Sequence, residues 1–313
     1  MDAIETRGLG KSYSKLFSFK KTVALEDLDL NVPTGKIFGF LGLNGAGKTT
    51  TIKMLLGLSH PTSGSGSVLG RPLGDVKAKE KIGFLPEEAY FQRHLTSVEF
   101  LNFCGRTLHM DANTRKNKIE EMLDLVSMTE KANVKLSQFS KGMLQRIGVA
   151  QALLNDPDLV IFDEPLTGLD PKGRSQLKDI MVALQKRGKT VFFSSHILSD
   201  VQAICNNVAI LNRGHRIFQG ELTEILEIKK YDLRFPSIPA KYLDALEKIS
   251  EGLAKDGEGW VIQANSEKQK QKICKSLEKV NIIPKSVSII YKDLEPVFLE
   301  RIEANNKERG LAS

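Results

Sequence analysis

Three short apolar runs in the first two thirds of the chain have the character of buried strands. They occupy residues 36–41, 159–162 and 190–193. Helical spacing of apolar positions follows the first run over residues 51–58 and recurs over residues 174–185. Strands that alternate with helices predict an α/β domain with a largely parallel sheet.

Two regions depart from this alternation. Residues 90–154 are mostly helical and predict a helical insertion inside the α/β domain. From about Glu221, strand-like runs (231–235, 260–264, 286–291) occur among helical stretches (241–250, 267–280, 294–304). We therefore expect two domains, residues 1–220 and a small C-terminal α+β domain at 221–313, which is large enough for a core of its own. The run Ser63-Gly-Ser-Gly-Ser67 predicts a surface turn.

Composition is that of a soluble globular protein, with 41% hydrophobic and 27% charged residues. The sequence has no run of about 18 apolar residues and no apolar core near its N-terminus, so we expect neither a membrane span nor an export signal. Three widely spaced cysteines fit a reduced cytosolic protein. The net charge of +7 arises in the first 220 residues. This excess is either an ordinary solvated surface, which charge alone favours, or a surface suited to a nucleic acid, an anionic lipid or a polyanionic small molecule.

A glycine-rich segment connects the first strand to the first helix. Gly42-Leu-Asn-Gly-Ala-Gly-Lys-Thr-Thr50 contains the phosphate-loop pattern G-x(4)-G-K-[ST]. Glycines let the backbone curl so that successive N–H groups point toward phosphate oxygens, and the next helix adds its positive dipole end. Lys48 is expected to reach the β- and γ-phosphates, and the Thr49 hydroxyl to ligate magnesium. The other nucleotide-binding candidates of the loop are Gly42, Asn44, Gly45, Ala46, Gly47 and Thr50.

Two carboxylates follow the apolar run at residues 159–162. Asp163 is a candidate magnesium ligand, directly or through water, because it ends a strand beside the phosphate loop. Glu164, one residue later, points differently and can polarise a water against the γ-phosphate. Strands that end in solvated acids are common, so the two carboxylates alone do not indicate a catalytic site. The nearby phosphate loop is what makes a catalytic role the better interpretation.

Over residues 1–220 these motifs resemble the ATP-binding subunits of ABC transporters. The segment from Leu136 to Arg146 resembles the signature segment of that family, and Gly168-Leu-Asp170 resembles the loop that crosses the dimer interface. The resemblance makes Asp163 the magnesium aspartate and Glu164 the general base. It also places His196 on the γ-phosphate and Tyr13 on the adenine ring.

The signature segment departs from the family pattern at two positions. Lys141 and Met143 stand where the family has glycine and glutamine, whereas Ser140 and Gly142 are kept. The kept hydroxyl and helix N-terminus remain available to a phosphate. A lysine here either adds charge near the γ-phosphate or points to solvent, and the sequence leaves both open.

Three further features bear on the membrane partner. Glu87 occupies the position of a glutamine that usually reaches magnesium and water, and a carboxylate can also supply an oxygen ligand. Glu87 and the altered signature residues resemble those found in a bacterial branch of this family. Members of that branch work with exporters of drugs, antibiotics or polysaccharides. The segment 293–299 resembles the end of that branch's accessory domain. The connection at residues 14–21 is longer than usual and is either a basic membrane-proximal hairpin or a solvated turn.

The resemblance implies an ATPase that uses ATP and Mg²⁺ to power a transporter, favouring an exporter over an importer. Its expected partners are a second ATP-binding subunit, as a homodimer or heterodimer, and a transmembrane permease; nucleic acid is not expected. The chain would then lie peripherally on the cytoplasmic face of the membrane. The permease helix would dock near Glu87, with candidate groove residues Tyr90, Phe91, Phe100 and Phe103.

Two other classes compete with this reading. One is an ABC ATPase that acts on ribosomes or nucleic acid; a single cassette, the absence of sustained heptads and the diffuse charge argue against it. The other is a different phosphate-loop enzyme, such as a kinase, against which the signature segment, Asp170 and His196 argue.

Overall fold

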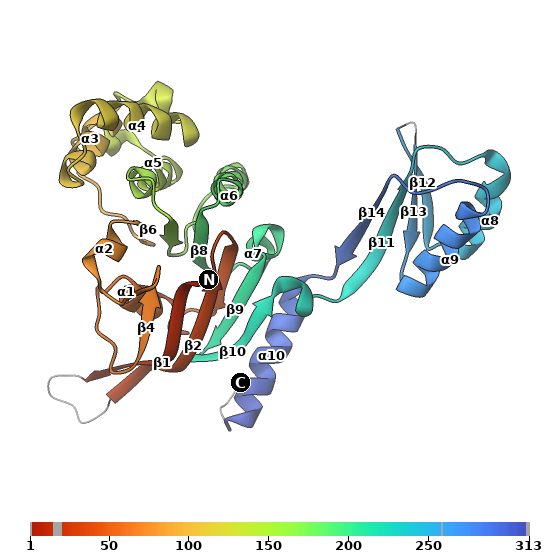
Figure 1. Cartoon of the computed structure of the whole chain (residues 1–313), viewed down its shortest axis with the longest axis horizontal. Coiled ribbons are helices and arrows are strands. Elements are labelled where there is room, and N and C mark those ends of the chain that lie inside the picture. The colour runs from red at the N-terminus through yellow and green to blue at the C-terminus, as the bar shows by residue number, and fades with distance from the viewer. Residues whose placement is uncertain (1, 15–20, 258, 311–313) are drawn as a thin grey trace. The chain divides into compact units, whose positions relative to one another are not determined.

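The structure is a computed structural model that describes residues 2–14, 21–257 and 259–310. The core of the unusually long connection at residues 14–21 lies outside the described residues. The chain forms two compact units (Figure 1). The first unit comprises Met1–Leu222 together with Phe298–Ser313, and the second comprises Thr223–Val297.

A six-stranded sheet forms the centre of the first unit, in the order β10-β9-β3-β8-β7-β6. The strands are β3 (Ile37–Gly42), β6 (Ile82–Leu85), β7 (Leu159–Phe162), β8 (Thr190–Ser195), β9 (Asn207–Asn212) and β10 (His215–Glu221). Neighbouring strands from β9 to β6 run parallel, and β10 joins the edge antiparallel to β9. Every residue of β3, β7 and β8 is buried, as expected for parallel strands covered on both faces. The predicted α/β class with a largely parallel sheet is confirmed.

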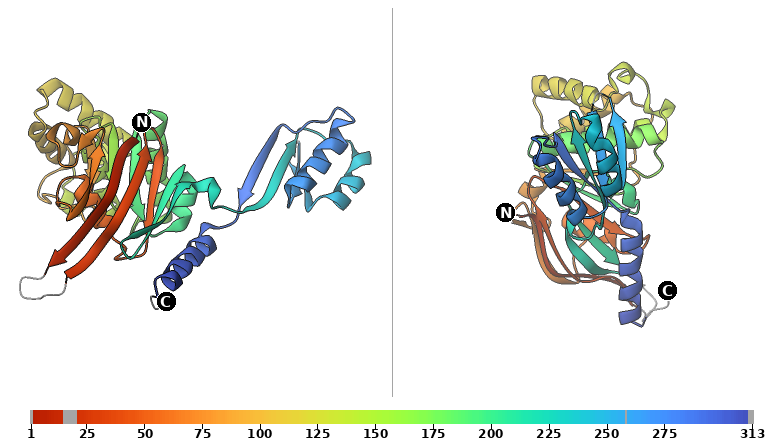
Figure 2. Two further views of the ribbon diagram at one scale, coloured as in Figure 1. Left: turned by 60° about the horizontal axis from the view of Figure 1, so that its bottom comes forward. Right: turned by 90° about the vertical axis from the view of Figure 1, so that its right-hand side faces the viewer.

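A second sheet of the first unit, in the order β2-β1-β4-β5, is antiparallel (Figure 2). Its strands are β1 (Asp2–Ser14), β2 (Lys21–Pro33), β4 (Ser63–Val68) and β5 (Arg71–Pro72). The prediction of a surface turn at Ser63–Ser67 was wrong, because this segment pairs with β1 as strand β4. Gly64 has a φ of 72°, and a Cβ there would collide with the Gly8 carbonyl, so glycine permits this close pairing.

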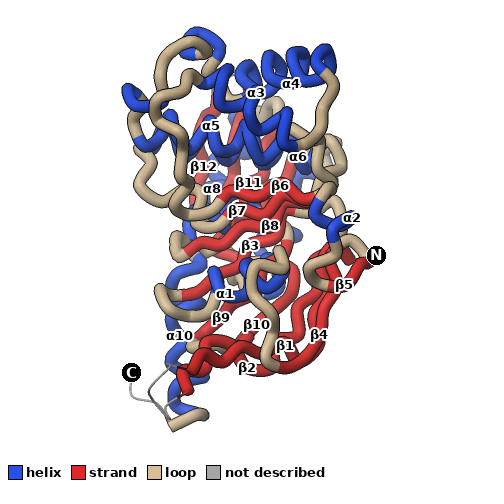
Figure 3. Tube along the Cα trace, turned by 90° about the vertical axis from the view of Figure 1, so that its left-hand side faces the viewer, coloured by secondary structure: helices blue, strands red, loops and turns tan. Residues whose placement is uncertain are grey.

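The helices of the first unit flank the central sheet. They are α1 (Lys48–Leu55), α2 (Val76–Lys79), α3 (Ser97–Thr107), α4 (Ala112–Leu125), α5 (Lys141–Leu153), α6 (Pro171–Lys186) and α7 (Leu198–Ile204), with single turns η1 (Thr129–Lys131) and η2 (Leu136–Gln138). Helices α3, α4 and α5 group beyond β6 and β7 (Figure 3). Thr96 and Glu99 form a reciprocal capping box that starts α3. Residues 90–154 thus contain these three helices and none of the described strands.

The second unit is an antiparallel sheet covered by helices. Strands β11 (Ile228–Phe235), β12 (Gly252–Asp256), β13 (Gly259–Ala264) and β14 (Ser286–Tyr291) lie in the order β12-β13-β11-β14. The helical elements are η4 (Ala240–Tyr242), α8 (Leu243–Ile249) and α9 (Glu267–Glu278), and the single turn η3 (Leu222–Glu224) spans the boundary with the first unit. Leu233, Phe235 and Ile262 of the sheet pack with Ile273 and Leu277 of α9 in a core of their own.

The last helix, α10 (Leu294–Glu308), departs from the predicted domain boundary. The sequence places residues 221–313 in one C-terminal domain, whereas residues from Phe298 onward group with the first unit. The side chains of α10 explain the difference. Asn305 and Asn306 accept hydrogen bonds from Asn212 of β9, and the Arg301 guanidinium lies 4.7 Å from the centre of the Phe218 ring of β10.

Candidate nucleotide site

The phosphate loop lies between the end of β3 and the start of α1. Two of its glycines are required by the space around them. A Cβ at Gly42 would lie 2.6 Å from the Leu211 carbonyl oxygen. Gly47 has a φ of 109°, and a Cβ there would lie 2.6 Å from the Ala24 carbonyl oxygen. At Gly45, with a φ of 80°, a Cβ would meet no described atom within 4 Å, so this residue is selected by backbone conformation alone.

Lys48, the first residue of α1, turns back over the loop. Its ammonium donates to the carbonyls of Gly42 at 2.7 Å and Leu43 at 3.3 Å. The same nitrogen lies 3.1 Å from Glu164 Oε1, and both side chains are only 6% exposed. Since an isolated buried charge is costly, each of these two ions depends on the other and on the loop carbonyls.

Glu164 is held in an unusual conformation at the end of β7. Its φ is 47°, in the left-handed region that costs a non-glycine residue roughly 1–2 kcal/mol. Oε2 lies 2.8 Å from His196 Nδ1 and accepts from the Thr167 hydroxyl at 3.2 Å. An ionised carboxylate only accepts hydrogen bonds, so the first contact puts a proton on Nδ1. Oε1 is buried without a hydrogen-bond partner among the described residues, although it faces the charge of Lys48.

Ser194 of β8 joins the two carboxylate residues, and sequence reasoning missed it. Its buried hydroxyl donates to Asp163 Oδ1 at 2.6 Å and accepts the Glu164 backbone N–H at 2.8 Å. One hydroxyl therefore orients the Asp163 side chain and fixes the backbone from which Glu164 projects. The only sequence signal was its place two residues before His196, and that signal gives no indication of a contact with β7.

A cavity of about 290 Å³ opens beside the loop. Its lining comprises Ala24, Asn44, Gly45, Gly47, Lys48, Thr49, Thr50, Glu87 and Glu164. Six of the predicted loop residues thus meet Glu87 and Glu164 around one space. Ala24 lies far away in sequence and carries no chemical signal, so sequence reasoning missed it.

Other predicted residues lie apart from this lining. Among the described lining residues, neither Asp163 nor Tyr13 occurs. Tyr13 is 44% exposed near the end of β1, where it pairs with Thr22 and has the Lys11 ammonium 5.2 Å from its ring centre. Gly42 and Ala46 contribute backbone instead: Lys48 donates to the Gly42 carbonyl, and the Ala46 N–H donates to the Leu43 carbonyl at 3.1 Å.

The signature segment and the loop ending in Asp170 meet each other at a second location. Ser140 begins α5 by accepting the Met143 N–H at 3.3 Å, and Asp170 begins α6 by accepting the Gly173 N–H at 3.0 Å. The exposed Lys141 extends over Gly168, where a Cβ would lie 2.5 Å from its ammonium nitrogen.

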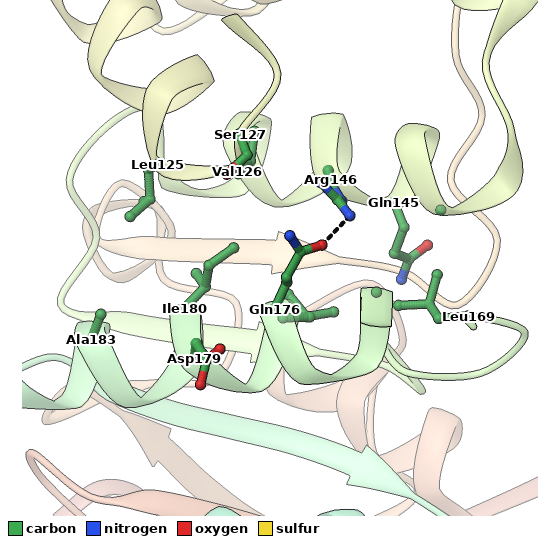
Figure 4. A pocket seen from close by; sticks show the side chains of 13 residues that line it. Leu125, Val126, Ser127, Gln145, Arg146, Leu169, Gln176, Asp179, Ile180 and Ala183 are labelled. Atoms are coloured by element: carbon green, nitrogen blue, oxygen red, sulfur yellow. Dashed lines mark hydrogen bonds between the residues drawn. The ribbon is translucent and has the colours of Figure 1, made fainter. Parts of the chain in front are cut away.

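Beside them, a cavity of about 300 Å³ separates α5 from α6 (Figure 4). Gly142 and Leu169 contribute to its lining, and Arg146 of α5 donates to Gln176 of α6 across it.

The four candidate groove aromatics divide into two groups. Phe100 is buried in α3 and contacts Phe91 edge to face, with ring centres 5.3 Å apart. Tyr90 is 90% exposed and Phe103 is 53% exposed. Only Tyr90 and Phe103 therefore present large apolar surface to a partner.

The donors near the loop fit a hard divalent cation. Asp163, Glu87 and the Thr49 hydroxyl all offer oxygen, and the described residues contain no group of three or more His, Cys, Asp or Glu side chains suited to a metal. Magnesium does not need such a cage, because it commonly binds one or two carboxylates together with substrate phosphates and water. The orphaned Glu164 Oε1 beside the Lys48 ammonium likewise fits a site completed by a phosphorylated ligand.

Comparison with known proteins gives the same picture. A family model described as ABC transporter matches residues 25–167. An ABC transporter ATP-binding protein of Synechocystis sp. is 39% identical over 100% of this chain and 87% of its own length. The Nod factor export ATP-binding protein I of Cupriavidus pinatubonensis is 34% identical over 72% of this chain and 68% of its own. A solved ATP-binding subunit of an ABC transporter has a TM-score of 0.64 at 29% identity, covering 71% of this chain and 91% of that one.

The fold and the loop cavity define a phosphate-loop ATPase domain. Because the similarity extends over the full chain and most of the Synechocystis relative, the chain belongs to the ATP-binding proteins of ABC transporters. It is therefore an enzyme that binds and hydrolyses ATP. The family resemblance drawn from the sequence motifs is confirmed at this level.

Ser194→Ala tests whether this hydroxyl positions the two carboxylates. We expect kcat for ATP hydrolysis to fall about 10- to 100-fold, since small misplacements of reacting groups have effects of this size. The KM for ATP should change less than threefold, because the loop is untouched. The measurement is steady-state phosphate release over a range of ATP concentrations.

Thr6→Val provides the matched control, because the buried Thr6 hydroxyl donates to the Leu28 carbonyl at 2.8 Å and is not among the described residues lining the cavity. It should lower thermal stability to a similar extent and leave kcat unchanged. Equal losses of kcat in both variants, or no loss with Ser194→Ala, would contradict a positioning role.

Proposed function

We propose that this chain is the ATP-hydrolysing subunit of a membrane exporter and that Glu164 is its general base. The observation that carries the proposal is the asymmetric environment of the Glu164 carboxylate. His196 and Thr167 hold Oε2, while Oε1 has no hydrogen-bond partner among the described residues and faces only the Lys48 ammonium at 3.1 Å, which a phosphate would engage instead. A general base needs such an arrangement, because one oxygen fixes the group and the other receives a proton from water.

The phosphate loop supplies binding for the nucleotide. Backbone N–H groups around Gly45 and Gly47 and the N-terminus of α1 present positive potential to an anion. Lys48 currently donates to two loop carbonyls, and a phosphate oxygen would give its ammonium a charged partner instead. Thr49, Glu87 and Asp163 would hold Mg²⁺, which when bound neutralises charge on the phosphate oxygens.

Hydrolysis then depends on two side chains of this chain. Glu164 Oε1 accepts a proton from the attacking water, and the bond from His196 to Oε2 keeps the carboxylate from rotating away. The other ring nitrogen of His196, Nε2, would face the γ-phosphate that this water attacks. Ser194 holds the backbone of Glu164 while this proton moves.

A second ATP-binding subunit would complete the site. Ser140, Lys141, Gly142 and Met143 are not among the described residues that line the cavity beside this chain's own loop. The family resemblance brings these residues to the ATP of a partner subunit, with Asp170 at the contact between the two. The exposed Lys141 side chain, free to leave Gly168, would add a positive charge there.

Membrane attachment would come from a permease subunit. In the part of the chain that the structure describes, no helix is long and apolar enough to cross a bilayer. Tyr90 and Phe103 are the exposed aromatics near Glu87 in sequence and are our candidates for contacting a permease helix. Support for export comes from the named function of the Cupriavidus relative and from Glu87, Lys141 and Met143, which resemble the residues of the exporter branch. The second unit would be the accessory domain of that branch, and the chain would lie on the cytoplasmic face.

Glu164→Gln tests the assignment of the base. The amide cannot accept the proton, so we expect ATP turnover to fall 10²–10⁴-fold. Lys48 keeps its bonds to the Gly42 and Leu43 carbonyls, and ATP affinity should therefore survive. Phosphate release and equilibrium binding of a fluorescent ATP analogue measure the two properties. Undiminished hydrolysis by Glu164→Gln would exclude Glu164 as the base.

Affinity capture from detergent-solubilised native membranes tests the transporter assignment. Glu164→Gln protein with ATP and magnesium should retain a polytopic membrane protein, because blocked hydrolysis prolongs the ATP-bound state. Lys48→Ala is the matched control and should retain less, since it weakens nucleotide binding at the same loop. Recovery of ribosomes or nucleic acid in place of a membrane protein would contradict the proposal.

A further inference from the structure

The turn between β9 and β10 is bonded directly to the phosphate loop. The Gly214 N–H donates to the Ala46 carbonyl of the loop at 2.8 Å, and the Glu26 N–H donates to the Gly214 carbonyl at 2.9 Å. Arg213 and Gly214 have φ values of 46° and 84°, as a tight two-residue hairpin turn requires. The turn therefore lies between β2 and the loop and bonds to both.

The packing around this turn leaves little room for adjustment. Gly42 pairs with Leu211 in the sheet, two residues before the turn begins. A Cβ at Gly47 would lie 2.6 Å from the Ala24 carbonyl oxygen, and one at Gly214 would lie 3.1 Å from the same atom. Because loop, turn and β2 touch through backbone atoms, a displacement of the turn must displace the loop.

Helix α10 fixes this turn through a buried amide cluster. Asn212, the residue before the turn, donates from Nδ2 to Asn305 Oδ1 and Asn306 Oδ1, both at 3.0 Å. Asn212 and Asn306 are 4% and 7% exposed. Burial makes these bonds specific, because a buried amide without a hydrogen-bond partner is costly. The helix can thus dock well only when the turn is in this position.

Polar and charged side chains lie on the other side of the turn. His215 Nε2 lies 3.2 Å from Glu26 Oε2, and the guanidinium of Arg309, which follows the last residue of α10, lies 3.9 Å from the same oxygen. Burial lowers the pKa of His215, and the nearby Arg309 charge adds to this. Glu26 is also the residue whose N–H holds the Gly214 carbonyl. The C-terminal end of the chain therefore approaches the turn on two sides, through Asn212 of β9 and through Glu26 of β2.

We propose that α10 positions the phosphate loop for nucleotide binding, with Asn305 and Asn306 acting through Asn212 and the Arg213–Gly214 turn on the Ala46 carbonyl. The two asparagines are positioning residues, because they touch neither the loop nor its cavity. The proposal concerns nucleotide affinity and holds for whichever membrane partner the chain serves. It gives α10, which begins in the second unit at Leu294, a place in the ATP cycle of the first unit.

The double variant Asn305→Leu/Asn306→Leu in the full chain tests the proposal. It leaves the Asn212 amide without its acceptors and frees the turn. We expect the Kd for MgADP and the KM for ATP to rise about fivefold or more, the range typical of coupling between sites. The kcat at saturating ATP should change less than twofold, because Glu164 and His196 are held by β7 and β8. Fluorescence titration and phosphate release provide these values.

Arg301→Ala is the matched control on the same helix. It removes the contact with Phe218, which lies along β10 beyond the turn, and should leave both the MgADP affinity and the KM unchanged. A loss of thermal stability in the double variant with unaltered Kd and KM would show that α10 is only a structural support, and would overturn the proposal.

Hydrogen exchange on the unmodified chain gives an independent test that does not depend on how the variant folds. Coupling is reciprocal, so if a docked α10 favours nucleotide binding, MgADP must stabilise the docked helix. The amides of residues 298–308 should exchange several-fold more slowly with MgADP than without it. Unchanged exchange in this helix, at MgADP concentrations that protect α1, would contradict the coupling.

Discussion

The buried contact between Lys48 and Glu164 is the constraint on which the rest of the site depends. Two ionised side chains, each only 6% exposed, lie 3.1 Å apart with no described hydrogen-bond partner for the glutamate oxygen that faces the lysine. Removing either ion would leave the other buried and uncompensated, which typically costs 3–5 kcal/mol. The fold must therefore bring the loop after β3 and the end of β7 to the same point, and the parallel sheet does this by aligning the carboxyl ends of its strands.

That contact also explains the strained backbone at Glu164. A φ of 47° is unfavourable for glutamate, yet the Ser194 hydroxyl accepts its N–H, and His196 and Thr167 hold its side chain. These groups lie on β8, on the segment after it and on the turn after β7. The conformation that aims Glu164 at Lys48 is thus over-determined by neighbouring elements. A phosphate that enters the loop would replace Glu164 as the charged partner of Lys48. The Glu164 carboxylate would then be available to accept a proton from water.

The sequence predicted the parts of the molecule that short, local patterns encode. Lys48 and its loop follow from glycine spacing, and Asp163 and Glu164 from their place after an apolar strand. The sheet of strands β2-β1-β4-β5 was missed, because its strands are half exposed and the pairing of β1 with β4 joins residues more than fifty positions apart. The strand β4 looked like a turn because serine and glycine pack there through backbone alone. Ser194 and Asn212 are ordinary polar residues until the fold brings them to their partners. For the same reason, the sequence did not indicate that residues from Phe298 onward group with the first unit.

The most direct test of this account is the structure of the chain with a non-hydrolysable ATP analogue and magnesium. We predict a γ-phosphate oxygen between Lys48 and Glu164, with the ammonium bonded to phosphate and a water against Glu164 Oε1. His196 should remain on Oε2. The central claim is that this buried ion pair marks the position that the γ-phosphate occupies. It would be contradicted by an analogue bound with the direct contact between Lys48 and Glu164 intact, or with Glu164 turned away from the γ-phosphate.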